Sequence, residues 1–139
     1  MKIEHVGIAV HDLDSAVKNY QMLLNQPCYK KEHVASEQVD TAFFLQEDAK
    51  VELLAATSED SAIAKYLEKR GQGIHHIAFE VEDITKELTR LKSEGYTLLN
   101  EEAKKGADNK LVAFVHPKDN QGVLIELCQT LKSSGSPIG

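Results

Sequence analysis

Two histidines and two glutamates stand at matching places in the two halves of the chain. His5 and His76 lie 71 positions apart, in the similar stretches IEHVGIAVHDL and IHHIAFEVEDI. Glu52 and Glu126 lie 74 positions apart, in KVELLAA and VLIELCQ. Imidazole nitrogens and carboxylate oxygens together suit a divalent ion of borderline or hard character, such as zinc, cobalt, nickel or manganese. Such a ligand set leaves coordination positions for water or substrate oxygens.

The alternation of bulky and small residues indicates which face of each strand carries these side chains. In the first strand of each half, large apolar residues share one face, and the histidine shares the other with smaller neighbours. Glu52 and Glu126 interrupt apolar runs, where an ionised carboxylate needs a partner or a metal ion. A single His or Glu in a strand more often has a surface or hydrogen-bonding role. Because the four recur together, we predict that they bind one metal ion between halves related by a pseudo-two-fold axis.

Each half predicts the same order of elements: a strand, a helix and three further strands. The stretch KIEHVGIAV alternates as a strand does, and DLDSAVKNYQMLLN has apolar residues at helical spacing behind the capping candidates Asp12 and Asp14. The second half repeats this order with a strand over 73–81 and a helix after Asp83. The remaining strands are expected near 27–34, 38–46 and 50–56, and near 96–100, 111–116 and 122–129.

We therefore expect an α+β fold, in which tandem βαβββ modules form a curved mixed sheet around a metal site. The whole of 1–131 is predicted to be a single domain. Its modules span about 1–57 and 73–131, and a linking helix occupies 58–71. The small, polar residues 132–139 are expected to form a C-terminal tail.

Composition argues against several classes of protein. The net charge is −6 and the basic residues are scattered, whereas nucleic-acid binding needs a basic face. No run approaches the roughly 18 apolar residues of a membrane span, and no signal peptide precedes the first strand, so we expect a cytoplasmic protein. Cys28 and Cys128 are too few and too far apart for a disulfide framework or a cysteine zinc site, which suggests a reducing compartment.

The other histidines are not predicted to be ligands. His75 has the wrong strand parity, although it could support a ligand indirectly. His11 lies at a strand-to-helix turn, His33 has no counterpart in the other half, and His116 stands in a loop before Pro117. For each of these, a surface or structural role is expected.

These residues and the stretches around them resemble the vicinal oxygen chelate superfamily, which includes glyoxalases, bleomycin resistance proteins and extradiol dioxygenases. Within it, the chain resembles the methylmalonyl-CoA epimerases from about Met1 to Gln129. The likeness is carried by HVGIAVHDLDSAVKNY, KVELLAATSEDSAIAKYLEKRGQGIHHIAFEVEDI and FVHPKDNQGVLIELCQ. It implies a glyoxalase-like fold. It also implies metal ligands at His5, Glu52, His76 and Glu126.

The resemblance implies a 1,1-proton transfer that interconverts (2R)- and (2S)-methylmalonyl-CoA through a metal-stabilised enolate. It further implies cobalt, with zinc, nickel or manganese as alternatives, and a homodimer. Inversion needs acid–base groups on both sides of the enolate. Glu126 is expected to be one base. The family's second acid lies on the strand after the first hairpin, where QVDTAFFL offers only Asp40; Thr41 is an alternative at that position, and Glu52 is an alternative base.

CoA carries anionic phosphates, which lysine side chains can bind. Lys118 in HPKD, and Lys104, Lys105 and Lys110 in EEAKKGADNK, are candidate contacts, although a solvated surface lysine is the common case. The loop EEAKKGADNK is also a candidate lid.

The first alternative is lactoylglutathione lyase or another metal-dependent lyase or isomerase of this superfamily, and the second is a metal-free small-molecule binding protein. Lactoylglutathione lyase has the same metal set, but that family holds glutathione with strand-borne arginines, and here the only arginines, Arg70 and Arg90, fall in predicted helices. A metal-free binding protein of the same fold would need an aromatic-lined cleft, and this chain has no Trp and few aromatic residues. An extradiol dioxygenase or thiol transferase would use two histidines and one glutamate, with little reason to retain Glu52.

Overall fold

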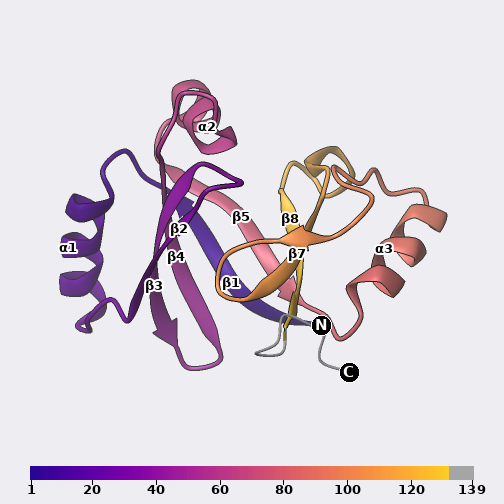
Figure 1. Cartoon of the computed structure of the whole chain (residues 1–139), viewed down its shortest axis with the longest axis horizontal. Helices are drawn as coiled ribbons and strands as arrows, with labels where there is room; N and C mark the ends of the chain where they lie inside the picture. The colour runs from indigo at the N-terminus through magenta and orange to yellow at the C-terminus, as the bar shows by residue number, and fades with distance from the viewer. Residues whose placement is uncertain (132–139) are drawn as a thin grey trace. The chain divides into compact units, whose positions relative to one another are not determined.

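The computed structural model describes residues 1–131 and contains the repeated order of elements that the sequence predicts (Figure 1). The predicted C-terminal tail, 132–139, lies outside the described residues. Within the described residues, no helix is both long enough and apolar enough to cross a bilayer. The elements are β1 (Lys2–Ala9), α1 (Leu13–Leu24), β2 (Lys30–Val34), β3 (Val39–Gln46), β4 (Ala49–Ala56), α2 (Ala62–Arg70), β5 (Gly73–Glu80), α3 (Ile84–Ser93), β6 (Lys104–Lys105), β7 (Lys110–Val115), the 3₁₀ helix η1 (Pro117–Asp119) and β8 (Ile125–Thr130).

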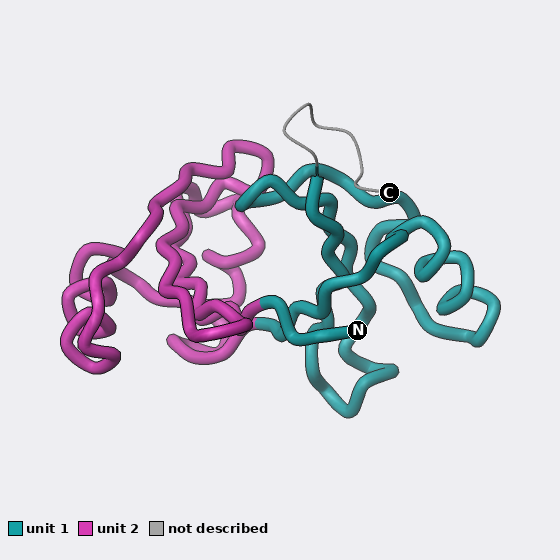
Figure 2. Tube along the Cα trace, turned by 90° about the horizontal axis from the view of Figure 1, so that it is seen from below, with its two compact units in different colours: residues 1–4, 76–139 teal, residues 5–75 magenta. Residues whose placement is uncertain are grey.

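The chain forms two compact units (Figure 2). The first unit consists of residues 5–75, and its strands follow the order β2-β3-β4-β1. β1 runs parallel to β4, and the other neighbours are antiparallel. Helix α1 packs on one face of this sheet, where Val17 joins Phe44 and Leu53 in an apolar core. The opposite face is therefore available to side chains of other kinds.

The second unit consists of residues 1–4 and the described residues from 76 onward, and its strands follow the order β5-β8-β7-β6. β5 runs parallel to β8, and the other neighbours are antiparallel, as in the first unit. Helix α3 covers one face, where Ile84, Leu88 and Leu91 pack with Leu127. The sheet in each unit is mixed and has one face covered by a helix, which agrees with the predicted α+β class.

Equivalent aspartates begin the equivalent helices. The side chain of Asp12 accepts a hydrogen bond from the backbone N–H of Ser15 (3.2 Å), and Asp83 accepts one from the N–H of Lys86 (3.1 Å). Each such cap contributes about 1 kcal/mol to helix stability. The linking helix α2 ends at Gly71, as predicted, with φ of 75° and an N–H bond to the carbonyl of Leu67.

The prediction of a strand near 96–100 is wrong. This segment contributes only an isolated bridge between Leu98 and Val115, and the short strand β6 pairs with β7 instead. The side chain of Asn100 explains the difference, because its Oδ1 accepts the hydrogen bond that the backbone N–H of Phe114 would give to a strand partner (2.8 Å). A side-chain amide replaces part of the backbone ladder here.

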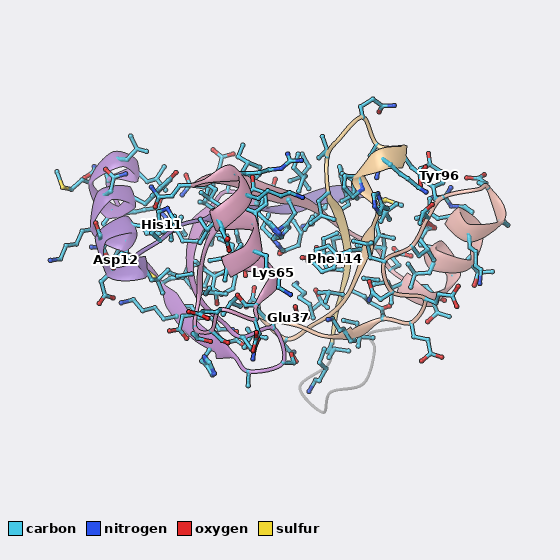
Figure 3. All side chains as sticks on the ribbon, turned by 90° about the horizontal axis from the view of Figure 1, so that it is seen from above. His11, Asp12, Glu37, Lys65, Tyr96 and Phe114 are labelled. Atoms are coloured by element: carbon cyan, nitrogen blue, oxygen red, sulfur yellow. The ribbon has the colours of Figure 1, made fainter. Side chains whose placement is uncertain are left out.

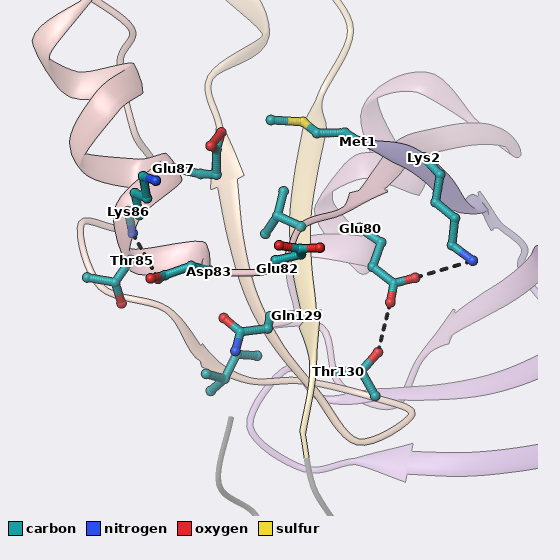
Figure 4. A pocket seen from close by; sticks show the side chains of 12 residues that line it. Met1, Lys2, Glu80, Glu82, Asp83, Thr85, Lys86, Glu87, Gln129 and Thr130 are labelled. Atoms are coloured by element: carbon teal, nitrogen blue, oxygen red, sulfur yellow. Dashed lines mark hydrogen bonds and ion pairs between the residues drawn. The ribbon is translucent and has the colours of Figure 1, made fainter. Parts of the chain in front are cut away.

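A network of charged and polar groups, with Lys110 and Glu4 buried at its centre, connects the start of β1 to the rest of the second unit. Lys110 is 7% exposed, and its Nζ donates to Thr130 Oγ1 (2.6 Å) and lies 3.8 Å from Oε2 of Glu4, which is 6% exposed. Thr130 Oγ1 donates to Glu80 Oε2 (3.1 Å), and Lys2 Nζ lies 3.7 Å from the other oxygen of Glu80, at the edge of a pocket (Figure 4). Opposite charges compensate each other throughout this network.

The substitution Lys110→Met is expected to lower the free energy of unfolding by about 3 kcal/mol, because it leaves the buried Glu4 carboxylate without this compensating charge. Chemical denaturation measures the change. The matched control is K104M, which removes an exposed lysine of β6 and should change the free energy by less than about 0.5 kcal/mol. The double variant E4Q/K110M should recover part of the loss, and a K110M protein as stable as K104M would contradict the prediction.

Candidate metal centre

In the first unit, His5 and Glu52 face each other from neighbouring parallel strands. The Nε2 atom of His5 lies 3.2 Å from Oε1 of Glu52, and the residues are 5% and 4% exposed. The register aligns Gly7 with Glu52 on one side and Phe43 with Glu52 on the other. Because paired strand residues point to the same face, this pair lies on the face opposite helix α1.

In the second unit, His76 and Glu126 repeat the arrangement. The Nε2 atom of His76 lies 3.2 Å from Oε1 of Glu126, and the residues are 3% and 5% exposed. The register aligns Ala78 and Phe114 with Glu126 on its two sides. The ring of Phe114 (labelled in Figure 3) stands edge-on to the imidazole of His76, with centroids 5.8 Å apart. This pair lies on the face opposite helix α3.

The two units thus present one motif, a buried glutamate between a small residue and a phenylalanine, with an imidazole nitrogen 3.2 Å from its carboxylate. Phe43 and Phe114 are 71 positions apart, like the two histidines, and this signal of the repeat was overlooked in the sequence. Burial of a carboxylate is costly without compensating charge. Paired nitrogen and oxygen donors in this setting fit a divalent cation.

Asp40 does not join Glu52, contrary to its predicted role as a base. Asp40 pairs with Ala55, which belongs to the core under α1, so its side chain lies on the helix-covered face of the sheet. There its Oδ1 lies 2.8 Å from Nδ1 of His33. Thr41 does lie on the face of Glu52, but its hydroxyl is buried and donates to the carbonyl of Glu32 (3.0 Å). Strand parity therefore separates Asp40 from the His–Glu pair.

Glu37 is a candidate functional residue that the sequence reasoning missed. It lies in the turn between β2 and β3 and is labelled in Figure 3. Its N–H bonds to the carbonyl of Val34, the following Gln38 has φ of 54°, and its carboxylate atom Oε1 is buried. The turn closes between Val34 and Val39, which pair with each other on the face that carries Glu52. A search of the turn as well as the strand would have found this acid.

The predicted CoA-binding lysines have different environments. Lys104, Lys105 and Lys118 are exposed. Lys104 pairs with Val112 and Lys105 with Leu111, so consecutive lysines of β6 point to opposite faces. Lys110 is buried in the network with Glu4, which removes it from the candidates because its ammonium group is inaccessible to a phosphate.

The remaining histidines have structural contacts or surface positions. The ring of His75 stands edge-on to Tyr66, with centroids 4.9 Å apart, and burial lowers its pKa to about 4, so it is neutral at physiological pH. His116 accepts a hydrogen bond from the N–H of Lys118 at the start of η1 (3.0 Å). His11 is exposed at the end of β1 (Figure 3). These environments agree with the surface or structural roles expected for these histidines.

Known proteins with similar sequences and structures share this architecture. The chain is 42% identical to the ethylmalonyl-CoA/methylmalonyl-CoA epimerase of Cereibacter sphaeroides, over 92% of this chain and 97% of that protein. It matches the structure of methylmalonyl-CoA epimerase from Mycobacterium tuberculosis with a TM-score of 0.90 and 38% identity, over 96% and 90% of the two chains. A methylmalonyl-CoA epimerase in complex with methylmalonyl-CoA and NH4+ gives a TM-score of 0.88 and 34% identity, over 98% of each chain.

The family model described as the Glyoxalase/Bleomycin resistance protein/Dioxygenase superfamily matches residues 4–114. This match begins within β1 and ends within β7, and it includes His5 and His76. The predicted glyoxalase-like α+β fold is confirmed. The chain therefore belongs to the glyoxalase, bleomycin resistance and dioxygenase superfamily.

Proposed function

We propose that this protein is an epimerase that interconverts (2R)- and (2S)-methylmalonyl-CoA by a 1,1-proton transfer at Cα. The observation that carries the proposal is the duplicated, buried His–Glu pair, with 3.2 Å between nitrogen and oxygen in each unit. It occurs in a chain that is 42% identical over 92% of its length to an ethylmalonyl-CoA/methylmalonyl-CoA epimerase. A neighbouring structure contains methylmalonyl-CoA, which supports an acyl-CoA substrate.

We propose that the two pairs hold one divalent cation, with cobalt favoured by family likeness and zinc, nickel or manganese as alternatives. The ligands would be His5, Glu52, His76 and Glu126. Imidazole and carboxylate donors suit such ions, and a cation of charge +2 would offset two buried carboxylates. When bound, the metal supplies Lewis-acid stabilisation of negative charge on the thioester oxygen, a contribution of several kcal/mol.

Two carboxylates of the chain are assigned to the proton transfer. Inversion at Cα needs one group that removes the proton and another that returns it from the opposite side. Glu126 is assigned to one side, as the sequence predicted. Glu37 is assigned to the other in place of Asp40, because the turn that carries Glu37 is closed by Val34 and Val39 on the Glu52 face of the sheet, whereas Asp40 lies on the face that α1 covers. One oxygen of this carboxylate, Oε1, is buried.

Exchange in D₂O tests the proposed function. Protein stripped of metal and reloaded with cobalt, manganese, nickel or zinc is incubated with (2R)-methylmalonyl-CoA, and NMR follows deuterium at Cα and formation of the other epimer. We expect exchange with at least one metal and a loss of at least about a hundredfold after chelation, because an unstabilised enolate forms slowly. Metal analysis should give about one ion per chain. Absence of exchange with all four metals would overturn the epimerase proposal.

Lactoylglutathione lyase remains the alternative within the same family. Its predicted requirement for strand-borne arginines is not met among the described residues, because Arg70 ends α2 and Arg90 lies in α3, where it pairs with Glu87 and Glu94. A parallel assay with the hemithioacetal of methylglyoxal and glutathione distinguishes the two activities. Turnover of that substrate alone would replace the epimerase with the lyase.

We also propose a homodimer in a reducing compartment such as the cytoplasm. Cys28 and Cys128 are both free thiols, which suits a reducing environment. The homodimer is supported by family likeness. Sedimentation equilibrium gives the mass in solution, and a mass equal to one chain would contradict the dimer.

A further inference from the structure

A lysine on the Glu52 face of the first unit lies outside the set that the sequence predicted to contact CoA. We propose that Lys30 binds an anionic oxygen group of the acyl-CoA substrate, either the carboxylate or a phosphate. This inference rests on the proposed function, because it names the residue that recognises the charge of the same substrate. It concerns recognition and not the proton transfer.

The backbone register places Lys30 and Glu52 in one row across the sheet. Lys30 of β2 pairs with Phe43 of β3, and Phe43 pairs with Glu52 of β4. Neighbouring strands are about 4.8 Å apart, so the backbones of Lys30 and Glu52 are separated by about 10 Å. The side chains of Lys30, Phe43 and Glu52 point to the same face. Only Phe43 therefore separates Lys30 from Glu52 of the candidate metal centre.

The ammonium group of Lys30 lies over this intervening residue. Its Nζ atom is 5.9 Å from the centroid of the Phe43 ring, within the range of a cation–π contact. Phe43 is only 1% exposed, whereas the Lys30 side chain is 38% exposed. The methylene stem therefore covers the ring, and the charged end stays accessible to a ligand. The cation–π contact limits the positions that the charge can adopt.

The charges around Lys30 provide variants with opposite expected effects. Glu32 lies on the same face, with Oε1 3.5 Å from Lys30 Nζ, and it competes with a bound anion for this cation. The adjacent Lys31 points to the other face, where its Nζ lies 3.8 Å from Asp14 of α1. Lys31 is therefore a control of the same residue type on the same strand, with its side chain on the other face and 55% exposed. In a protein of net charge −6, a local cation is needed to attract an anionic substrate.

The test measures kcat and KM for methylmalonyl-CoA at several salt concentrations in the metal-loaded protein. The substitution Lys30→Met should raise KM about fivefold to tenfold with little change in kcat, and it should weaken the dependence of KM on salt. K30R should retain the wild-type KM, and E32Q should lower it, whereas K31M should match the wild type. A structural role of Lys30 would not produce this opposite effect of E32Q or the loss of salt dependence.

Two probes identify the group that Lys30 binds. If K30M binds free CoA more weakly than the wild type in calorimetry, Lys30 binds a phosphate. If K30M has a higher KM than the wild type for methylmalonyl-pantetheine, which lacks the nucleotide, Lys30 binds the carboxylate. If K30M and K31M agree in KM, salt dependence and CoA affinity while the wild type catalyses exchange, the Lys30 inference is overturned and the epimerase stands. If the wild type catalyses no exchange, the proposed function fails, and this inference fails with it.

Discussion

The variant E126Q is expected to lose epimerisation, and Cα exchange for the epimer whose proton Glu126 removes, by about a thousandfold, the scale on which a positioned general base contributes to catalysis. Glutamine has the same shape as glutamate and keeps an oxygen that can face Nε2 of His76, so the second unit should fold normally. Its amide cannot accept a proton from Cα at neutral pH. The loss should therefore appear in kcat, with a smaller change in KM.

Exchange in D₂O with (2R)- and (2S)-methylmalonyl-CoA measures the effect of E126Q, and metal analysis of the same sample shows whether the ion is retained. E82Q, an exposed position just beyond β5, is the matched control and should behave as the wild type. E52Q tests the equivalent glutamate of the first unit, which is assigned as a metal ligand and not as a base, and it should retain far more activity than E126Q. Wild-type exchange by E126Q with bound metal would remove Glu126 from the proton transfer.

The repeat made the two His–Glu pairs predictable from the sequence. An alternating strand fixes the face of each residue, so His5 and His76 could be separated from His75 by parity alone. The carboxylates were recognised because Glu52 and Glu126 interrupt runs that are otherwise apolar. Each inference used only the residue types within one strand, and the structure then shows that the histidine and glutamate of each unit come within 3.2 Å of each other.

The errors arose where the outcome depends on contacts between elements. Asp40 was selected by residue type, but its face is set by pairing with Ala55 and by the helix that packs there. Lys110 was placed in an exposed loop, but it is buried beside Glu4, which is more than a hundred positions away in the chain. The strand expected near 96–100 is replaced in part by a hydrogen bond that the backbone N–H of Phe114 donates to the Asn100 side chain. In each case the deciding contact is with a residue on another element, which the pattern of residues within one strand or loop does not reveal.

The variant E37Q is expected to lose epimerisation while keeping Cα exchange for one of the two epimers. If Glu37 and Glu126 serve opposite sides of Cα, removal of Glu37 leaves Glu126 able to remove and return the proton on its own side. Deuterium should then enter one epimer without inversion, and the other epimer should be inert. Epimerisation should fall by at least about a hundredfold, as expected for loss of one acid–base group.

D40N is the matched control, because Asp40 is the acid that residue type alone selects, and it lies beside His33 on the face of the sheet that α1 covers. D40N should exchange and epimerise both substrates as the wild type does. Stereospecific exchange in E37Q separates a proton-transfer role from general damage, since an unfolded or metal-free protein would lose exchange for both epimers equally. Full epimerisation by E37Q would show that Glu37 is not the second base. Exchange of only one epimer by D40N would assign that role to Asp40 instead.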